Sequence, residues 1–251
     1  MKKILLVVLM LAMTLCAFTA CGGKKEDINK KSAGVMTHAE YVAAEDDATV
    51  VIEAYVQAKQ GWWEKNGQGV ASIYAQDGVG GYFIYELPCT EAQYNQMKTG
   101  TKIQVTGSRA TWAGEIEIMN VTDFKILSGK YVAKPTDVTA LLGTDDLAKK
   151  MNMLVSFKGM TVAASTNADG EDVAFLYNWD GSGQKGSDLY FNVMIGGETY
   201  NFCVESYLCD QNTDVYKAVE ALEIGDVIDL EGFLYWYDGA NPHITSVKAA
   251  D

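Results

Sequence analysis

Residues 97–121 read MKTGTKIQVTGSRATWAGEIEIMNV, and their pattern returns 125 residues later in LEIGDVIDLEGFLYWYDGANPHITSV, residues 222–247. Each stretch has a glycine at the end of a candidate helix, an alternating strand with an internal glycine, and a second strand behind a glycine turn. When one inserted residue is allowed in the later copy, the second strands of the two stretches also align. A match that spans a helix end and two strands predicts that one small domain is built twice. The matched pairs are Met97 and Leu222, Gly100 and Gly225, Ile103 and Ile228, Val105 and Leu230, Gly107 and Gly232, Gly114 and Gly239, Ile118 and Ile244, and Val121 and Val247.

Alternating apolar residues upstream of each copy predict three more strands. A short helix then precedes the repeated stretch, and Thr90 with Gln93 forms a capping box for the first of these helices. The order of three strands, a helix and two strands is that of the OB fold, a five-stranded Greek-key barrel. The upstream strands are TVVIEAYVQA (49–58), ASIYAQ (71–76) and GYFIYEL (81–87) in the first half, and LVSFKGMTV (154–162) and the two strands of 188–208 in the second.

We therefore predict an all-β protein with short helices, formed by two tandem five-stranded OB-fold-like Greek-key barrels. The first barrel is expected at residues 48–130, and the second at 131–251 with an insertion at 165–187. Loops at that position border the binding face of many OB folds, although a plain surface hairpin explains the insertion equally well.

Two groups of glycines have expected structural roles. The run from Asp77 through Gly78 to Gly81 is predicted to form a turn that needs positive φ. Gly107 and Gly232 are predicted to let a strand coil tightly around a narrow barrel.

The N-terminus has the pattern of an export signal. Lys2 and Lys3 precede an apolar run over residues 4–17, and the sequence FTAC then ends at Cys21. This stretch resembles a bacterial lipobox, with the small Ala20 before the cysteine and Phe18 in place of the usual leucine. An ordinary signal cut after Ala20 and an uncleaved anchor are the alternatives.

The lipobox resemblance implies a leader at residues 1–20 and a diacylglyceryl thioether on Cys21, with an N-acyl chain such as palmitate. Several acyl chains anchor a protein stably in a membrane. Residues 21–47 are then expected to be a lipidated flexible tether with a short helical patch, in which Thr37 and Glu40 form a capping box. The expected location is extracytoplasmic, on the membrane of the cell envelope.

At QDGVGGYFIY (76–85) and GTKIQVTGSRATWAGEIEI (100–118) the first barrel resembles OB-fold modules of secreted bacterial nucleases and of uncharacterised lipoproteins from gut Firmicutes. Some of the nucleases use such barrels as nucleic-acid-binding accessories beside a catalytic domain. No catalytic domain is predicted here, so the resemblance implies a binding module without nuclease activity.

Charge argues against a polyanionic ligand. The formal net charge is −13, and removal of Lys2 and Lys3 with the leader would make it −15. So acidic a chain repels phosphate backbones, which disfavours nucleic acid as a partner.

Candidate catalytic and metal-binding residues are few. His38 and His243 stand in no triad or metal-ligand spacing, and the acidic pairs at 145–146 and 171–172 are typical of solvated loops. We predict no enzyme activity, no metal and no cofactor. After loss of the leader and lipidation of Cys21, the cysteines left are Cys89, Cys203 and Cys209; a Cys203–Cys209 disulfide and buried thiols both remain open.

Aromatic residues are the best candidates for a binding surface, because flat rings stack on bases or sugars. Core packing is the alternative for each of them, since small barrels need large inward side chains. Trp62 and Trp63 are adjacent on a strand, so one of the two should be exposed. The ligand-binding candidates are Trp62, Trp63, Tyr74, Tyr82, Trp112, Trp179 and Trp236, with Tyr85, Tyr190 and Tyr237 as further rings of the same kind.

Three functions follow as hypotheses. The first is a non-enzymatic, membrane-anchored module that binds a protein or glycan partner through its barrel faces. The second is binding of single-stranded nucleic acid, and the third is an unrecognised hydrolase.

Overall fold

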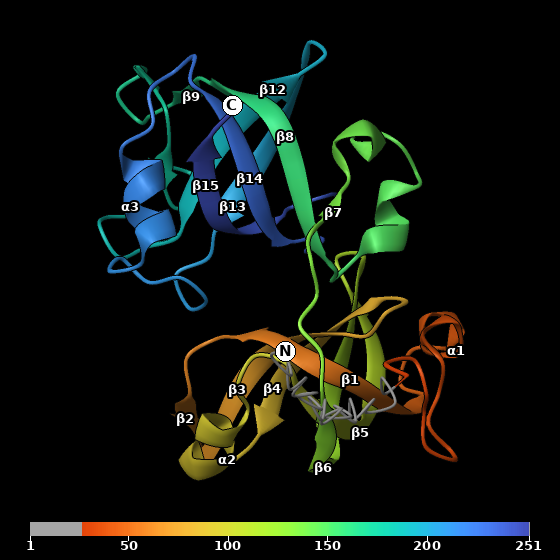
Figure 1. Ribbon diagram of the computed structural model, residues 1–251. Coiled ribbons are helices and arrows are strands. Elements are labelled where there is room, and N and C mark those ends of the chain that lie inside the picture. Colours follow the sequence, from red (N-terminus) through yellow and green to blue (C-terminus); the bar gives the residue numbers. More distant parts are fainter. Residues whose placement is uncertain (1–26, 251) are drawn as a thin grey trace, which may run out of the picture.

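The computed structural model describes residues 27–250, and most of its strands form two closed sheets (Figure 1). In the first, the strands pair in the order β1-β5-β6-β4-β3-β2, and pairing of β1 with β3 closes the barrel. The β4–β6 pair is parallel and the other pairs are antiparallel. The elements of this barrel 1 are β1 (Thr49–Lys59), β2 (Trp63–Lys65), β3 (Gln68–Gln76), β4 (Gly81–Pro88), α2 (Glu91–Gln96), β5 (Thr101–Trp112) and β6 (Glu115–Lys130).

The second sheet has the order β11-β12-β13-β15-β14-β8-β7, and pairing of β12 with β8 closes it. Its five main strands thus follow the pairing order of barrel 1, with the parallel pair at β13–β15. The elements of this barrel 2 are β7 (Thr136–Asp137), β8 (Leu154–Ala163), β11 (Leu176–Tyr177), β12 (Leu189–Ile195), β13 (Glu198–Val204), α3 (Asp214–Glu220), β14 (Val227–Phe233) and β15 (His243–Ala249). Between β8 and β11, β9 (Ser165–Thr166) and β10 (Asp172–Val173) form a separate two-stranded sheet.

The predicted all-β, OB-type fold is confirmed by this strand order. The helix between the third and fourth strands is present in both halves, and the Thr90–Gln93 capping box forms as predicted. Two short 3₁₀ helices, η1 (Thr139–Leu141) and η2 (Leu147–Lys150), lie in the segment that joins the barrels.

Gly107 and Gly232 occupy equivalent places in the two barrels. The strand register shifts at each of them, and an added Cβ on Gly107 would lie 2.7 Å from the Met119 carbonyl oxygen. An added Cβ on Gly232 would collide with the backbone of His243. Both glycines therefore allow the close approach of neighbouring strands, in agreement with the prediction.

The prediction for the glycine run at 78–81 was wrong. None of Gly78, Gly80 and Gly81 has positive φ. An added Cβ would instead collide with the His38 ring at Gly80 and with the Asn152 backbone at Gly81. These glycines are needed because other segments of the chain pack directly onto the backbone of this turn.

The expected flexible tether is also wrong for its described part, which begins at Asp27. The Lys31 ammonium lies 2.6 Å from the buried Asp77 carboxylate and donates to the Glu53 carbonyl oxygen. Burial alone would raise the pKa of Asp77, but Lys31 and the backbone N–H groups of the turn hold that pKa below its usual value. A buried carboxylate needs such a partner, so the segment is fixed to barrel 1.

Helix α1 (His38–Ala43) continues this packing (Figure 1). Its predicted Thr37–Glu40 capping box is present, and Tyr41 is 1% exposed within the core of barrel 1. The proposed leader and Cys21 lie outside the described residues. Within 27–250 the structure has no helix long and apolar enough to cross a membrane.

A small third cluster of apolar side chains joins the barrels. Tyr74 and Phe83 of barrel 1 pack with Phe233 of barrel 2, and the rings of Tyr74 and Phe233 stack with centroids 4.4 Å apart. The Tyr74 hydroxyl lies 2.9 Å from Nδ1 of His243. These contacts hold the barrels in one relative orientation.

Candidate ligand-binding groove between the barrels

Two cavities of about 590 Å³ each adjoin on the surface where the barrels meet. They share Tyr190, Tyr235 and His243, so we treat them as one feature, the junction groove. One part is lined by Gln60, Trp63, Ser72, Phe83, Tyr85, Glu86, Asp188, Glu205 and Tyr207, and the other by Trp179, Asn201, Tyr237 and Asn241.

Exposed aromatic rings border the junction groove on both sides. Trp63 of β2 is 44% exposed and Tyr85 of β4 is 37% exposed in barrel 1. Tyr207, Trp179 and Tyr237 of barrel 2 are 72%, 75% and 55% exposed. Large rings left in water around a concave site are typical of binding surfaces, since burying them against a ligand is favourable.

Ring contacts hold Tyr235, His243 and Phe83 in the lining of the junction groove. The ring of Tyr235 stacks on His243 with centroids 4.4 Å apart, and the rings of Phe83 and Tyr235 form a T-shaped pair with centroids 5.5 Å apart. Burial lowers the pKa of His243 to about 3, so its imidazole is neutral at physiological pH. A neutral imidazole can share one hydrogen bond with the Tyr74 hydroxyl without an unpaired charge.

The charged side chains that line the junction groove are all acidic. Glu205 is 8% exposed, and its carboxylate accepts a hydrogen bond from Gln60 of barrel 1 at 3.0 Å. Burial, with Asp188 nearby, raises the pKa of Glu205 to about 7. Glu86 is paired with Lys65 at 2.5 Å. None of the described residues that line the groove is a lysine or arginine.

Backbone contacts between the barrels keep the two walls in place. The Gly61 N–H, just before β2, donates to the Tyr207 carbonyl oxygen at 2.9 Å. This bond places the turn that carries Tyr207 beside the strand that carries Trp63. The two rings therefore belong to one surface although they lie far apart in the sequence.

The structure divides the predicted aromatic candidates into four groups. Trp63 and Trp179 line the junction groove, whereas Tyr74 and Tyr82 are fully buried and offer no ring to a ligand. Trp112 is 59% exposed at the end of β5 but lines neither part of the groove.

The two remaining tryptophans are half-buried. Trp62 packs on the core of barrel 1 and donates its indole N–H to the Cys89 carbonyl oxygen at 3.0 Å. Trp63 is the exposed member of that pair; one exposed ring was expected, but Trp62 lies before β2, so strand alternation is not the reason. Trp236 packs on the core of barrel 2. Sequence reasoning missed Tyr207 and Tyr235, and the only signal was the alternation that puts Tyr235 on the same side as Tyr237.

The cysteines and the acidic pairs that the sequence offers as reactive or metal-binding groups have structural surroundings typical of core and surface residues. Cys89, Cys203 and Cys209 are buried free thiols, so the Cys203–Cys209 disulfide is not formed. Asp146 pairs with Lys149, and Glu171 accepts a hydrogen bond from Asn167. Within residues 27–250 no three potential ligands gather around a possible metal position.

Comparison with known proteins identifies no family. No family model and no curated protein matches the chain. Among solved structures it is similar to the tetrameric p202 HIN2 domain (10% identity, 82% of this chain and 96% of that chain, TM-score 0.31) and to the single-stranded DNA-binding protein from Thermus aquaticus (10%, 83% and 95%, TM-score 0.27). A replication protein A heterotrimer bound to ssDNA is also similar (8%, 88% and 70%, TM-score 0.30). Likeness this low carries no argument about function, and the fold assignment rests on the strand order given above.

Proposed function

We propose that the chain is a non-enzymatic binding module, held on the extracytoplasmic side of a membrane by lipid on Cys21, that binds a glycan in the junction groove. The observation that carries the proposal is the combination of exposed rings from both barrels with a lining that, over residues 27–250, has acids and neither lysine nor arginine. Sugar rings present flat C–H faces to aromatic side chains, and their hydroxyls donate to carboxylates such as Asp188 and Glu205.

The charge of the groove favours a glycan over a nucleic acid. Each phosphate of an oligonucleotide would lie near acidic side chains, whereas binding of single strands normally uses a basic groove beside the stacking rings. A neutral glycan needs no counter-charge. Single-stranded nucleic acid stays the second candidate because the exposed rings would also stack on bases.

The test compares the two ligand classes directly. The full-length protein is titrated with neutral oligosaccharides and with labelled single-stranded oligonucleotides at low and moderate salt. The proposal expects saturable oligosaccharide binding that changes little with salt. Oligonucleotide binding that weakens steeply with salt, without oligosaccharide binding, would replace it with the nucleic-acid function.

The lipid anchor has a separate test. Cys21→Ser should abolish metabolic labelling with palmitate and release the protein from membranes, whereas Cys16→Ser, inside the proposed leader, should leave labelling intact. Unchanged labelling of the Cys21 variant would exclude this lipidation site.

A further inference from the structure

Two acids in the lining of the junction groove have no cationic partner within the chain. Asp188 is partly exposed, and the N–H and the hydroxyl of Ser206 donate to its Oδ1 at 2.8 Å and 2.6 Å. Its Oδ2 accepts no hydrogen bond from residues 27–250. Glu205 accepts from the uncharged amide of Gln60. Over the same residues, neither carboxylate pairs with a lysine or arginine.

These two carboxylates lie close enough to act on each other. Burial, and then the negative charge of Asp188, raise the pKa of Glu205 to about 7. Two like charges in a partly buried site repel each other, so a positive group beside them is stabilised more than it is in water. The third acid of the lining, Glu86, already has Lys65 at 2.5 Å. Asp188 and Glu205 are therefore the acids that a positively charged ligand can compensate.

The aromatic rings around these acids favour the same kind of ligand. The face of an aromatic ring attracts an ammonium group. Among residues 27–250, the lysines that lie over ring faces do so on Tyr55, Tyr82 and Tyr94, which are outside the groove. The rings that line the groove beside Asp188 and Glu205 are Trp63, Phe83, Tyr85, Tyr190, Tyr207 and Tyr235.

We propose that the part of the junction groove lined by Trp63, Asp188 and Glu205 holds an ammonium group, so that the preferred glycan carries free amino groups rather than acetylated ones. The inference rests on the proposed glycan function and narrows its ligand class. The rings alone accept neutral and charged sugars alike, whereas the two uncompensated acids favour the cation. Acetylation removes the positive charge and with it this preference.

The experiment compares two tetramers of the same linkage, one of glucosamine and one of N-acetylglucosamine. Their affinities for the full-length protein are measured at about pH 6, where the free amines are largely protonated. The glucosamine tetramer should bind about tenfold more tightly or better at low salt. In about 0.5 M salt this ratio should fall towards one, because salt screens the charges. Spermidine, a cation without sugar rings, should bind more weakly than the glucosamine tetramer.

Asp188→Asn tests the location of the ammonium group. The variant loses the negative charge but keeps an oxygen that can accept from Ser206, and the ratio of the two affinities should fall at least about threefold. The matched control is Asp47→Asn, at an exposed position outside the groove, where the left-handed backbone also suits asparagine. It removes the same charge and should keep the wild-type ratio.

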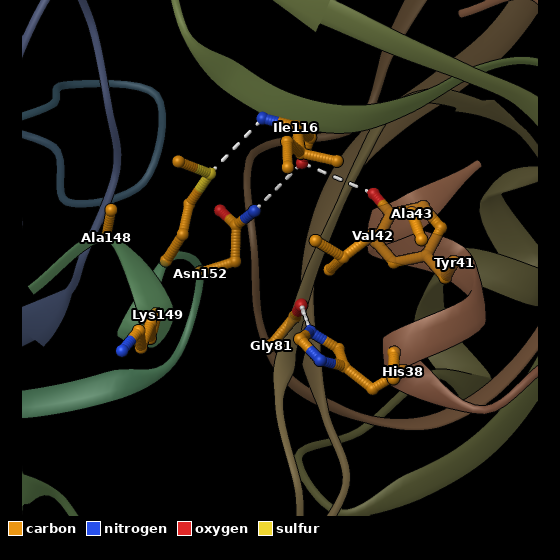
Figure 2. A pocket seen from close by; sticks show the side chains of 11 residues that line it. His38, Tyr41, Val42, Ala43, Gly81, Ile116, Ala148, Lys149 and Asn152 are labelled. Atoms are coloured by element: carbon orange, nitrogen blue, oxygen red, sulfur yellow. Dashed lines mark hydrogen bonds between the residues drawn. The ribbon is translucent and has the colours of Figure 1, made fainter. Parts of the chain in front are cut away.

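Another cavity gives a second control. It has a volume of about 340 Å³ and lies between α1 and the segment around η2, where Figure 2 shows Val42 and Ile116 in its lining. None of the described residues that line it is an aspartate or glutamate, and its lysine, Lys149, is paired with Asp146. An ammonium group finds no carboxylate there. Val42→Trp, at a 38% exposed position, fills this cavity and should keep the wild-type ratio.

Several results would overturn the ammonium site and leave the glycan function standing. They are equal affinity for the two tetramers, an equal fall of the ratio in Asp188→Asn and Asp47→Asn, loss of the ratio in Val42→Trp, and tighter binding of spermidine. Binding of other oligosaccharides but of neither tetramer would have the same meaning. If no oligosaccharide binds at all, the proposed glycan function is refuted, and this inference with it.

Discussion

Glu115 should make the stability of the protein fall as pH rises through neutrality. Its side chain is fully buried between the barrels, where it accepts hydrogen bonds from Asn152 at 2.5 Å and from the Trp236 backbone N–H at 2.8 Å. Burial outweighs these bonds and raises the pKa of Glu115 from 4.5 to about 8. Between these values the folded protein keeps a proton that the unfolded chain releases, so the free energy of unfolding decreases with pH.

The size of the effect follows from the same pKa values. A group that is protonated only in the folded state lowers the free energy of unfolding by about 1.4 kcal/mol for each pH unit, which gives roughly 1.5 kcal/mol between pH 6.5 and 8 for Glu115. Glu117, whose pKa burial raises to about 7, acts in the same direction. His243, whose folded pKa is about 3 against 6.5 unfolded, opposes them only below about pH 6.5.

Urea unfolding at pH 6.5 and pH 8 measures this difference. From pH 6.5 to pH 8 the free energy of unfolding of the wild-type protein should fall by about 1.5 kcal/mol or more. In Glu115→Gln this fall should be smaller by roughly 1.5 kcal/mol, because the titrating group is gone. Glu198→Gln, at an exposed position in β13, is the control and should behave as wild type. A pH dependence that is unchanged in Glu115→Gln would show that Glu115 is not the group that titrates.

Three other substitutions test contacts on which the fold depends. Gly81→Ala should destabilise the protein by about 1–3 kcal/mol because its Cβ collides with the Asn152 backbone, whereas Gly61→Ala, where a Cβ meets open space, should change little in thermal unfolding. Lys31→Met leaves Asp77 buried without its cation and should lower the free energy of unfolding by about 3–5 kcal/mol. Lys30→Met, at an exposed position, should leave it almost unchanged. Equal melting temperatures for these two variants would mean that the N-terminal segment is not fixed to barrel 1. Tyr74→Phe removes the hydrogen bond to His243 and should lower the free energy of unfolding in urea by about 1 kcal/mol. An unchanged free energy of unfolding would show that this bond does not hold the barrels together.

The features that the sequence predicts well are local ones. Alternation defines the strands, and Thr90 with Gln93 marks the start of α2. The matching glycines at 107 and 232 indicate equivalent bulges because a bulge is decided by a few adjacent residues.

Contacts between distant segments were not predictable in the same way. Lys31 and Asp77 are far apart in the sequence, and nothing in the polar run around Lys31 shows that one of its lysines pairs with a buried acid. The lining of the junction groove is decided by the relative orientation of the two barrels. Composition identifies Trp63 and Trp179 as possible platforms, but only the packing at Tyr74 and Phe233 determines that they share a surface.

Binding between the two barrels is tested by the affinity of the best-binding oligosaccharide for three tryptophan variants. Trp63→Ala removes a ring of the junction groove from barrel 1, Trp179→Ala removes one from barrel 2, and Trp112→Ala removes an exposed ring outside the groove. If the ligand lies between the barrels, the first two variants should each weaken binding about tenfold or more, at about 1–3 kcal/mol per stacking ring, while the third keeps wild-type affinity. Wild-type affinity in both groove variants, or an equal loss in Trp112→Ala, would contradict the claim that the two barrels form one binding site.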